Sequence, residues 1–178
     1  MTASHLLALL PPTELAGRVK AFRAAQGIQD AAAVPHVTVK ARSGLGDPPS
    51  WLGLACAVAA ETVPVSLTFG GLRLFGGGRA LYLTVQSPSA LALHLALLAA
   101  LKPEQQFSSE GPGMTPHLTL ALGRRGVDLN SLFMAAQREF ADLAATSLTW
   151  TASELVWLRK PGPGAVYLPV EAWPLGGG

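Results

Sequence analysis

A repeated tetrapeptide is the feature that most constrains this chain. His36-Val37-Thr38-Val39 recurs 81 residues later as His117-Leu118-Thr119-Leu120. In each copy polar and apolar residues alternate, which is the period of a β-strand with one buried face. Residues two apart on a strand point to the same side, so we expect each imidazole to lie beside its threonine hydroxyl. Two such strands brought together would place two histidines and two hydroxyls around one small group.

The surroundings of the two tetrapeptides repeat as well. Leu67-Thr68-Phe69 and Leu148-Thr149-Trp150 are also 81 residues apart. Each histidine strand is followed by an apolar helical stretch, at 51–60 and at 129–144, and each half closes with a similar strand, at 80–85 and at 165–170. We interpret this as an internal duplication, with repeats at about 12–86 and 87–171 and a tail at 172–178, within one bilobal domain that spans 1–178.

The predicted elements alternate between helices and strands. The helices are expected at 13–26, 50–61, 88–102 and 129–143, the last two capped by Ser87 and Asp128. The strands are expected at 35–41, 63–69, 72–75, 80–86, 117–122, 147–160 and 165–170, with Gly70-Gly71 as a hairpin turn and a bend near 152–153. This pattern predicts an α+β fold with mainly antiparallel strands and with helices packed outside.

The composition favours a soluble, cytoplasmic protein. Hydrophobic residues make up 49% of the chain and the mean hydropathy is +0.35. The longest apolar run, 90–101, is too short to span a bilayer and is interrupted by His94, while the apolar run at 1–10 lacks the basic residues of a signal peptide. The single cysteine, Cys56, is expected to be a buried structural thiol. A net charge of +2 mildly favours anionic partners.

The two histidines and two threonines are the residue types that acid–base chemistry on a phosphodiester requires. One imidazole can remove a proton from the attacking oxygen while the other protonates the departing oxygen. In-line attack needs these groups on opposite sides of phosphorus, which two separate strands provide. The threonine hydroxyls can donate hydrogen bonds to the non-bridging oxygens.

The paired motif, together with the duplicated layout, resembles the 2H phosphoesterase superfamily, and most closely its bacterial branch of 2′,5′ RNA ligases and RNA 2′,3′-cyclic phosphodiesterases. The resemblance implies a bilobal, duplicated fold with a central cleft, and it assigns His36, Thr38, His117 and Thr119 to the site. It implies hydrolysis of a 2′,3′-cyclic phosphate to a 2′-phosphate, with reversible 2′,5′ RNA ligation as a second activity in RNA processing and repair. It implies no metal and no other cofactor.

Three basic residues are candidate phosphate contacts. Lys40 lies two residues beyond Thr38 on the same predicted face, with a solvated strand-end lysine as the alternative. Many members of the family carry an arginine shortly after the second motif, whereas Ala121-Leu122 follow here and the basic pair Arg124-Arg125 comes later. Either arginine can supply the contact, or both are simply solvated.

Three aromatic residues are candidates for stacking on a nucleobase. Tyr82 and Tyr167 occupy equivalent positions in the two repeats, although packing is the more common role of a strand tyrosine. Phe107 precedes the second motif in a polar loop. His94, within an apolar helix, and His5, near the N-terminus, are not expected to take part in the site.

Other functions remain open at this level. The same residues suit a phosphodiesterase for another small substrate, such as 2′,5′-oligoadenylate or an ADP-ribose cyclic phosphate, or a non-catalytic module that binds RNA ends. A metal site is disfavoured because two histidines lack a third ligand at suitable spacing. The expected partners are RNA ends or nucleotides with a 2′,3′-cyclic phosphate, with no membrane and no obligate protein partner, and the expected state is a monomer.

Overall fold

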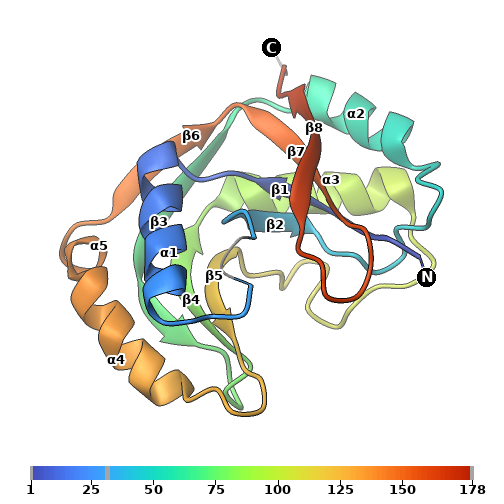
Figure 1. Cartoon of the computed structure of the whole chain (residues 1–178). Coiled ribbons are helices and arrows are strands. Elements are labelled where there is room, and N and C mark those ends of the chain that lie inside the picture. Colours follow the sequence, from blue (N-terminus) through green and yellow to red (C-terminus); the bar gives the residue numbers. More distant parts are fainter. Residues whose placement is uncertain (1, 31–32, 177–178) are drawn as a thin grey trace.

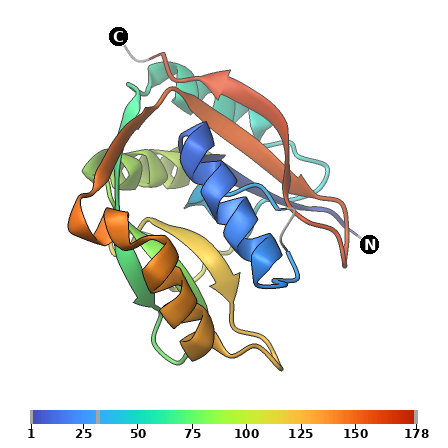
Figure 2. The ribbon, with the colours of Figure 1, turned by 60° about the vertical axis from the view of Figure 1, so that its left-hand side comes forward.

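The computed structural model describes residues 2–30 and 33–176 and shows an α+β fold built on one curled sheet. The eight strands follow the order β6-β3-β4-β5-β2-β1-β7-β8, and every neighbouring pair is antiparallel. The strands are β1 (Ser4–Leu9), β2 (Val37–Lys40), β3 (Val65–Leu74), β4 (Ala80–Gln86), β5 (His117–Leu122), β6 (Leu148–Ala152), β7 (Glu154–Lys160) and β8 (Leu168–Pro174). The helices are α1 (Thr13–Ala25), α2 (Leu52–Glu61), α3 (Pro88–Leu101), α4 (Leu129–Glu139) and α5 (Ala141–Ala145). Figures 1 and 2 show the sheet curving from β6 round to β8.

The two histidine strands form the middle of the sheet. In the described part of the chain the ladder between β2 and β5 consists of the pair Val37–Leu118. Both side chains are fully buried and belong to a core cluster that also contains Leu15 of α1, Leu93 of α3 and Leu129 of α4. Because side chains alternate along a strand, the helices therefore cover the face opposite the histidines. The histidines face the concave side of the curled sheet.

Several element boundaries agree closely with the sequence patterns. The structure has β4 at Ala80–Gln86 and β5 at His117–Leu122, as predicted. The Ser87 hydroxyl accepts a hydrogen bond from the Ala90 amide at the start of α3, and the Asp128 carboxylate accepts from two amides at the start of α4. Serine and aspartate favour these positions because they satisfy amides that have no partner within the helix.

The N-terminal run is a strand that the sequence analysis did not predict. Residues Ser4–Leu9 form β1, which lies between β2 and β7. Five of its six residues are buried, so the run lacks the alternation that identifies a strand with one solvated face. The last predicted strand is also displaced: β8 runs from Leu168 to Pro174 rather than over 165–170, and it includes part of the predicted tail.

One predicted turn was wrong, and one predicted strand is divided into two. Gly70-Gly71 is not a hairpin turn, because β3 continues through it with a register shift between Phe69 and Leu72. The strand predicted at 147–160, with a bend near 152–153, is divided at Ser153 into two strands: β6 pairs with β3 at one edge of the sheet, and β7 pairs with β1 and β8 in the other lobe. Glycine suits both a turn and a bulge, so composition alone does not distinguish them.

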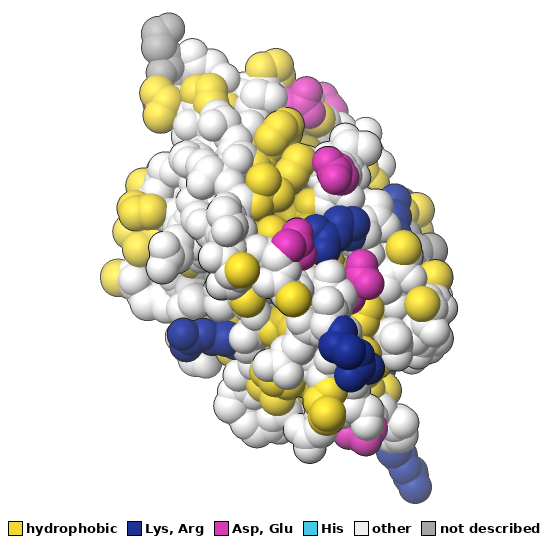
Figure 3. Space-filling view, turned by 90° about the vertical axis from the view of Figure 1, so that its left-hand side faces the viewer, with side chains coloured by type: hydrophobic (Ala, Val, Ile, Leu, Met, Phe, Trp, Pro, Cys, Tyr) yellow, Lys and Arg dark blue, Asp and Glu magenta, His cyan; other side chains and the backbone are white. Residues whose placement is uncertain are grey.

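Smaller departures concern one helix and one thiol. The helix expected at 129–143 is interrupted at Phe140, which separates α4 from α5. The Cys56 thiol lies on an exposed position of α2 and is not buried. Figure 3 shows the side that carries β3, α4 and α5, where apolar side chains gather between charged ones. Among the described residues, no helix is both long and apolar enough to cross a membrane.

Candidate active site

The register of β2 and β5 brings the two predicted motifs together. Because Val37 lies opposite Leu118, His36 lies across from Thr119, and Thr38 lies across from His117. Directly opposite residues on antiparallel strands point to the same face with Cβ atoms about 5 Å apart, and diagonal neighbours are about 7–8 Å apart. The two imidazoles are diagonal neighbours in this rectangle, which leaves room for a tetrahedral group between them.

Backbone carbonyls hold both imidazoles in the same way. His36 Nδ1 lies 2.8 Å from the Val34 carbonyl oxygen, and His117 Nδ1 lies 2.9 Å from the Thr115 carbonyl oxygen. A carbonyl only accepts hydrogen bonds, so Nδ1 carries the proton in both neutral rings. Each Nε2 then has a free lone pair, which is the atom that can exchange a proton with a ligand.

The surroundings of His36 disfavour its charged form. Burial lowers the pKa of His36 to about 4, and the positive charges of Arg23 and His117 act in the same direction, while the Val34 carbonyl partly offsets them. Burial also lowers the pKa of His117, against the effect of the Thr115 carbonyl. Both free histidines are therefore mainly neutral at pH 7.

Two aromatic rings pack against His117. The rings of Phe75 and Tyr82 stack 4.2 Å apart, and both meet His117 edge to face, at 4.8 Å and 5.4 Å between centroids. Tyr82, a predicted base-stacking residue, is 7% exposed, and its ring is in contact with the His117 imidazole. Phe75 is the more exposed ring of the pair.

Arg23 of α1 joins the two motifs and was missed by the sequence analysis. Its guanidinium donates hydrogen bonds to the carbonyls of Thr119 at 2.6 Å, Leu120 at 3.1 Å and Ala33 at 2.8 Å. It thus fixes the backbone of β5 at Thr119 and the segment that leads to His36. No sequence motif marks it, because its partners are backbone atoms up to 97 residues away.

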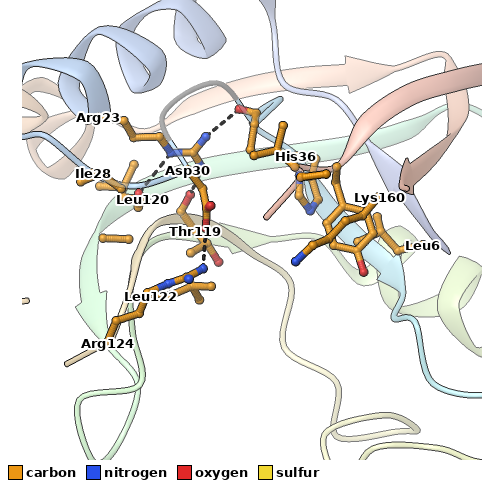
Figure 4. Close-up of a pocket in the computed structure, with 15 residues that line it drawn as sticks. Leu6, Arg23, Ile28, Asp30, His36, Thr119, Leu120, Leu122, Arg124 and Lys160 are labelled. Atoms are coloured by element: carbon orange, nitrogen blue, oxygen red, sulfur yellow. Dashed lines mark hydrogen bonds and ion pairs between the residues drawn. The ribbon is translucent and has the colours of Figure 1, made fainter. Parts of the chain in front are cut away.

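Two cavities open beside the rectangle of histidines and threonines. The cavity at His36 and Thr119 has a volume of about 250 Å³, and the cavity at Thr38 and His117 has a volume of about 460 Å³. Figure 4 shows the first, with Arg124 and Lys160 on its two sides. Its other charged lining residues are Arg23 and Asp30, whereas Arg79 and Glu110 line the larger cavity.

Lys40 lies in a closed ion pair. Its side chain is fully buried, and its ammonium contacts Glu110 Oε1 at 2.6 Å and the carbonyls of Ala41 and Ser43 at 2.9 and 2.7 Å. Hydrogen bonds from Lys40, Ser43 and the Phe107 amide outweigh burial and lower the pKa of Glu110. The three N–H groups of Lys40 are thus engaged, and the structure does not bring a free donor of Lys40 to the histidines.

The other predicted residues are distributed unevenly around the site. Arg124 and Tyr167 line the cavity at His36, and Arg124 is paired with Asp30 at 2.5 Å. Arg125 lines a separate cavity beside the start of α4. Phe107 is 41% exposed, lies beneath the Arg42 guanidinium and lines neither cavity at the histidines.

Two further cations near the histidines were not predicted. Arg79 ends the turn before β4, and its carbonyl accepts a hydrogen bond from Gly123, where any Cβ would overlap the Gly78 carbonyl oxygen. Lys160 ends β7 on the same face as Val156 and Leu158, which line the concave side with Leu6 and Ala8. Strand alternation at 156, 158 and 160 was the available signal for Lys160, but the strand's position in the sheet was not known.

The described residues contain no group of three or more histidine, cysteine, aspartate or glutamate side chains that could hold a metal ion. They also contain no buried side-chain nitrogen or oxygen without a hydrogen-bond partner. The chemistry that the arrangement supports is proton transfer by two imidazoles, one as base when neutral and one as acid when protonated, beside two hydroxyl donors.

Solved structures share this fold across almost the entire chain. A phosphoesterase superposes with a TM-score of 0.65 at 16% identity, covering 98% of this chain and 99% of its own. TT0787 of Thermus thermophilus gives 0.63 at 19% identity, and E. coli LigT complexed with NADP+ gives 0.62 at 16%, each covering 98% of both chains. No curated protein sequence matches the chain.

The sequence itself matches a family model over most of its length. The model describes the 2′-5′ RNA ligase superfamily and aligns with residues 11–163, a range that includes both histidine motifs. The expected α+β fold, with antiparallel strands around a concave site and helices outside, is confirmed by the structure and by its neighbours. The chain therefore belongs to the 2′-5′ RNA ligase superfamily of 2H phosphoesterases.

Proposed function

We propose that this protein hydrolyses RNA or nucleotide 2′,3′-cyclic phosphates to 2′-phosphates, by acid–base catalysis with His36 and His117. The observation that carries the proposal is the pair of imidazoles with matching Nδ1–carbonyl hydrogen bonds and free Nε2 atoms on one concave face. Superfamily membership supports phosphoesterase chemistry. The neighbour E. coli LigT has been crystallised with 3′-AMP and with ATP, which agrees with a nucleotide ligand.

The proposed reaction uses the two imidazoles on opposite sides of phosphorus. One neutral Nε2 takes a proton from water as its oxygen forms a bond to phosphorus. The bond from phosphorus to the 3′ oxygen breaks, and the other imidazole, protonated, gives that oxygen its proton. Thr38 and Thr119 donate hydrogen bonds to the non-bridging oxygens, where negative charge builds up. When a ribose 5′-hydroxyl attacks in place of water, the same ring opening gives a 2′,5′ linkage and a free 3′-hydroxyl. In the reverse reaction this 3′-hydroxyl attacks phosphorus, the 5′ oxygen leaves with a proton, and the two histidines exchange roles.

A non-catalytic RNA-end binding module is the competing proposal. Binding alone does not require two imidazoles, each with its Nδ1 proton directed to a carbonyl and its Nε2 free. Catalysis uses this arrangement directly, so we favour the enzyme. Within 2–30 and 33–176, no contact favours 2′,5′-oligoadenylate or an ADP-ribose cyclic phosphate over RNA ends.

The first test is turnover in the presence of EDTA. The purified protein is incubated with adenosine 2′,3′-cyclic phosphate and with an RNA that ends in this group, and the products are separated as 2′- and 3′-phosphates. We expect a 2′-phosphate. His36→Ala and His117→Ala should each lower kcat by about 10²–10⁴-fold, and Thr38→Val and Thr119→Val by about 10²-fold.

Thr151→Val, on an exposed position of β6, is the matched control and should turn over like the wild type. A folded wild-type protein that binds the RNA end without converting either substrate would favour the binding module. Activity that requires an added metal ion would contradict the two-histidine mechanism.

A further inference from the structure

The side chains that line the cavity beside His36 have a net positive charge. Three cationic side chains, Arg23, Arg124 and Lys160, and one anionic side chain, Asp30, line it, a net charge of +2 with His36 neutral. The charged residues that line the cavity at His117 are Arg79 and Glu110, and because Glu110 is already paired with Lys40, a single positive charge remains there. A buried or half-buried excess of charge favours a ligand of opposite sign.

The hydrogen-bond and ion-pair partners of these cations show why a net positive charge remains in the cavity. Arg23 donates to neutral carbonyls, which satisfy its N–H groups but leave its charge in place. Asp30 is already paired with Arg124, which Gln29 also contacts at 3.3 Å. Among the described residues, the Lys160 ammonium has no hydrogen bond or ion pair in the structure, although its strand fixes its direction toward the cavity.

The scissile phosphate cannot contact all of these cationic side chains. It must lie within the rectangle of histidines and threonines, and of these four residues only His36 and Thr119 line the charged cavity. The cavity continues from them to Arg124, after the end of β5, and to Lys160, at the end of β7. Figure 4 shows these two side chains reaching toward the space from opposite sides, with His36 and Thr119 along its border.

We propose that the cavity beside His36 is a subsite for a second phosphate of the substrate, held between Lys160 and Arg124. This proposal rests on the proposed function, and it specifies the substrate class: RNA ends with a phosphate 5′ to the terminal nucleotide, rather than cyclic mononucleotides with a free 5′-hydroxyl. At about 250 Å³ the cavity is smaller than a typical pocket for a complete ligand, roughly 300–1,000 Å³, and suits one part of a larger substrate.

Arg124 is prepared for such a role by its contact with Asp30. The carboxylate engages one guanidinium nitrogen and Gln29 the other, so the side chain is held in place while other N–H groups remain available. Lys160 supplies a single ammonium charge from the opposite lobe. A phosphate between them would bridge the β4–β5 and β1–β7 halves of the sheet.

The test compares two substrates that differ by one phosphate. Adenosine 2′,3′-cyclic phosphate and its 5′-phosphorylated form are hydrolysed by the wild type, by Lys160→Ala and by Lys20→Ala, an exposed lysine of α1 that lines neither cavity. We expect the wild type and Lys20→Ala to prefer the 5′-phosphorylated substrate, and Lys160→Ala to lose about tenfold of that preference in kcat/KM. For the 5′-phosphorylated substrate, the slope of log KM against log salt concentration should also be smaller by about one in Lys160→Ala than in the wild type.

Three outcomes would overturn the proposal. The first is a wild type without preference for the 5′-phosphorylated substrate, and the second is a preference that Lys160→Ala retains. The third is a loss of kcat/KM in Lys160→Ala that is equal for both substrates, which would place Lys160 on the scissile phosphate. A preference abolished by Arg79→Ala instead would move the subsite to the cavity at His117. In each of these cases the enzyme still turns over, whereas failure of the proposed function appears as no turnover of either substrate by the wild type.

Discussion

At the scale of single residues, the proposed mechanism depends on the protonation states of the two imidazoles. Catalysis needs one neutral and one protonated histidine at the same time. Because burial lowers the pKa of both below the usual value near 6.5, this combination is most populated on the acid side of that value. The two imidazoles interact, so the pH dependence of the rate reports apparent pKa values of the pair rather than of either histidine.

We therefore predict that kcat/KM for a 2′,3′-cyclic nucleotide peaks below pH 6.5. A bound phosphate stabilises both imidazolium forms and raises their pKa values, so the kcat profile should lie at higher pH than the kcat/KM profile. Initial rates from pH 4 to 9 at constant ionic strength measure both profiles. A kcat/KM maximum above pH 7.5 would contradict the conclusion that burial lowers the pKa values of both histidines.

Arg23 acts on the site through the backbone and through its charge. We expect Arg23→Met to lower stability by at least about 2 kcal/mol, because buried carbonyls lose their donors, and to lower kcat because the segments at His36 and Thr119 lose a common anchor. Removing the cation should also raise the pKa of His36. NMR titration of the His36 ring measures this directly.

Arg23→Lys separates the two effects of this residue. It keeps a positive charge but loses the planar fork of donors, so it should lower kcat while it leaves the pKa of His36 closer to the wild-type value. If both variants shift the pKa equally, the change is structural and the electrostatic role of Arg23 is wrong.

At the scale of elements, a buried ion pair attaches the loop before β5 to β2. Glu110 accepts from Lys40, from the Ser43 hydroxyl at 2.6 Å and from the Phe107 amide at 2.8 Å, and His94 accepts from the Gly111 amide while it contacts the Val39 carbonyl. This loop also carries the Thr115 carbonyl that orients His117. The pair thus links β2 to the loop that leads into β5.

Glu110→Gln should destabilise the protein by about 3–5 kcal/mol, because it leaves the Lys40 ammonium buried without its counter-charge. Urea unfolding at pH 7 measures the loss. The double variant Lys40→Met/Glu110→Leu removes both charges and should recover much of it. A double variant less stable than Glu110→Gln would show that the polar contacts, rather than charge balance, hold the loop.

At the scale of the whole molecule, the site makes the fold sensitive to acid. The pKa of His36 is about 4 in the folded protein and near 6.5 in an unfolded chain, so the unfolded state binds more protons between these values. The free energy of unfolding should therefore fall as the pH is lowered from 6.5 toward 4. The lowered pKa of His117 acts in the same direction.

His36→Ala should lose part of this dependence and show a smaller drop in stability between pH 7 and pH 5 than the wild type. Carboxylates with lowered pKa values, such as Glu110, contribute mainly below this window. Urea unfolding of both proteins at the two pH values measures the difference. An equal drop in the two proteins would place the acid sensitivity elsewhere.

The elements that were predictable have local signals. β4 and β5 alternate in polarity and are bounded by glycine, proline or a helix cap, and their limits follow from the sequence. β1 has no such signal because both of its faces are buried, and the path from β6 to β7 across Ser153 depends on pairing with strands far away in the chain. The duplication, with repeats near 12–86 and 87–171, remains our proposal. The matching segments at 67–69 and 148–150 pair with each other in the sheet, with Thr68 and Thr149 joined by a 3.2 Å contact.

Alternation and capping are local properties of the chain, and they were sufficient to predict the two motif strands, the side of each strand on which its histidine and threonine lie, and the α+β class. The tertiary structure places His36 across from Thr119 and Thr38 across from His117, which no local pattern indicated. It also decided that Lys40 is enclosed by Glu110, while Arg23, Arg124 and Lys160 meet beside His36. Which charges meet depends on strand order and register, and these are fixed by packing between residues distant in sequence rather than by any local pattern.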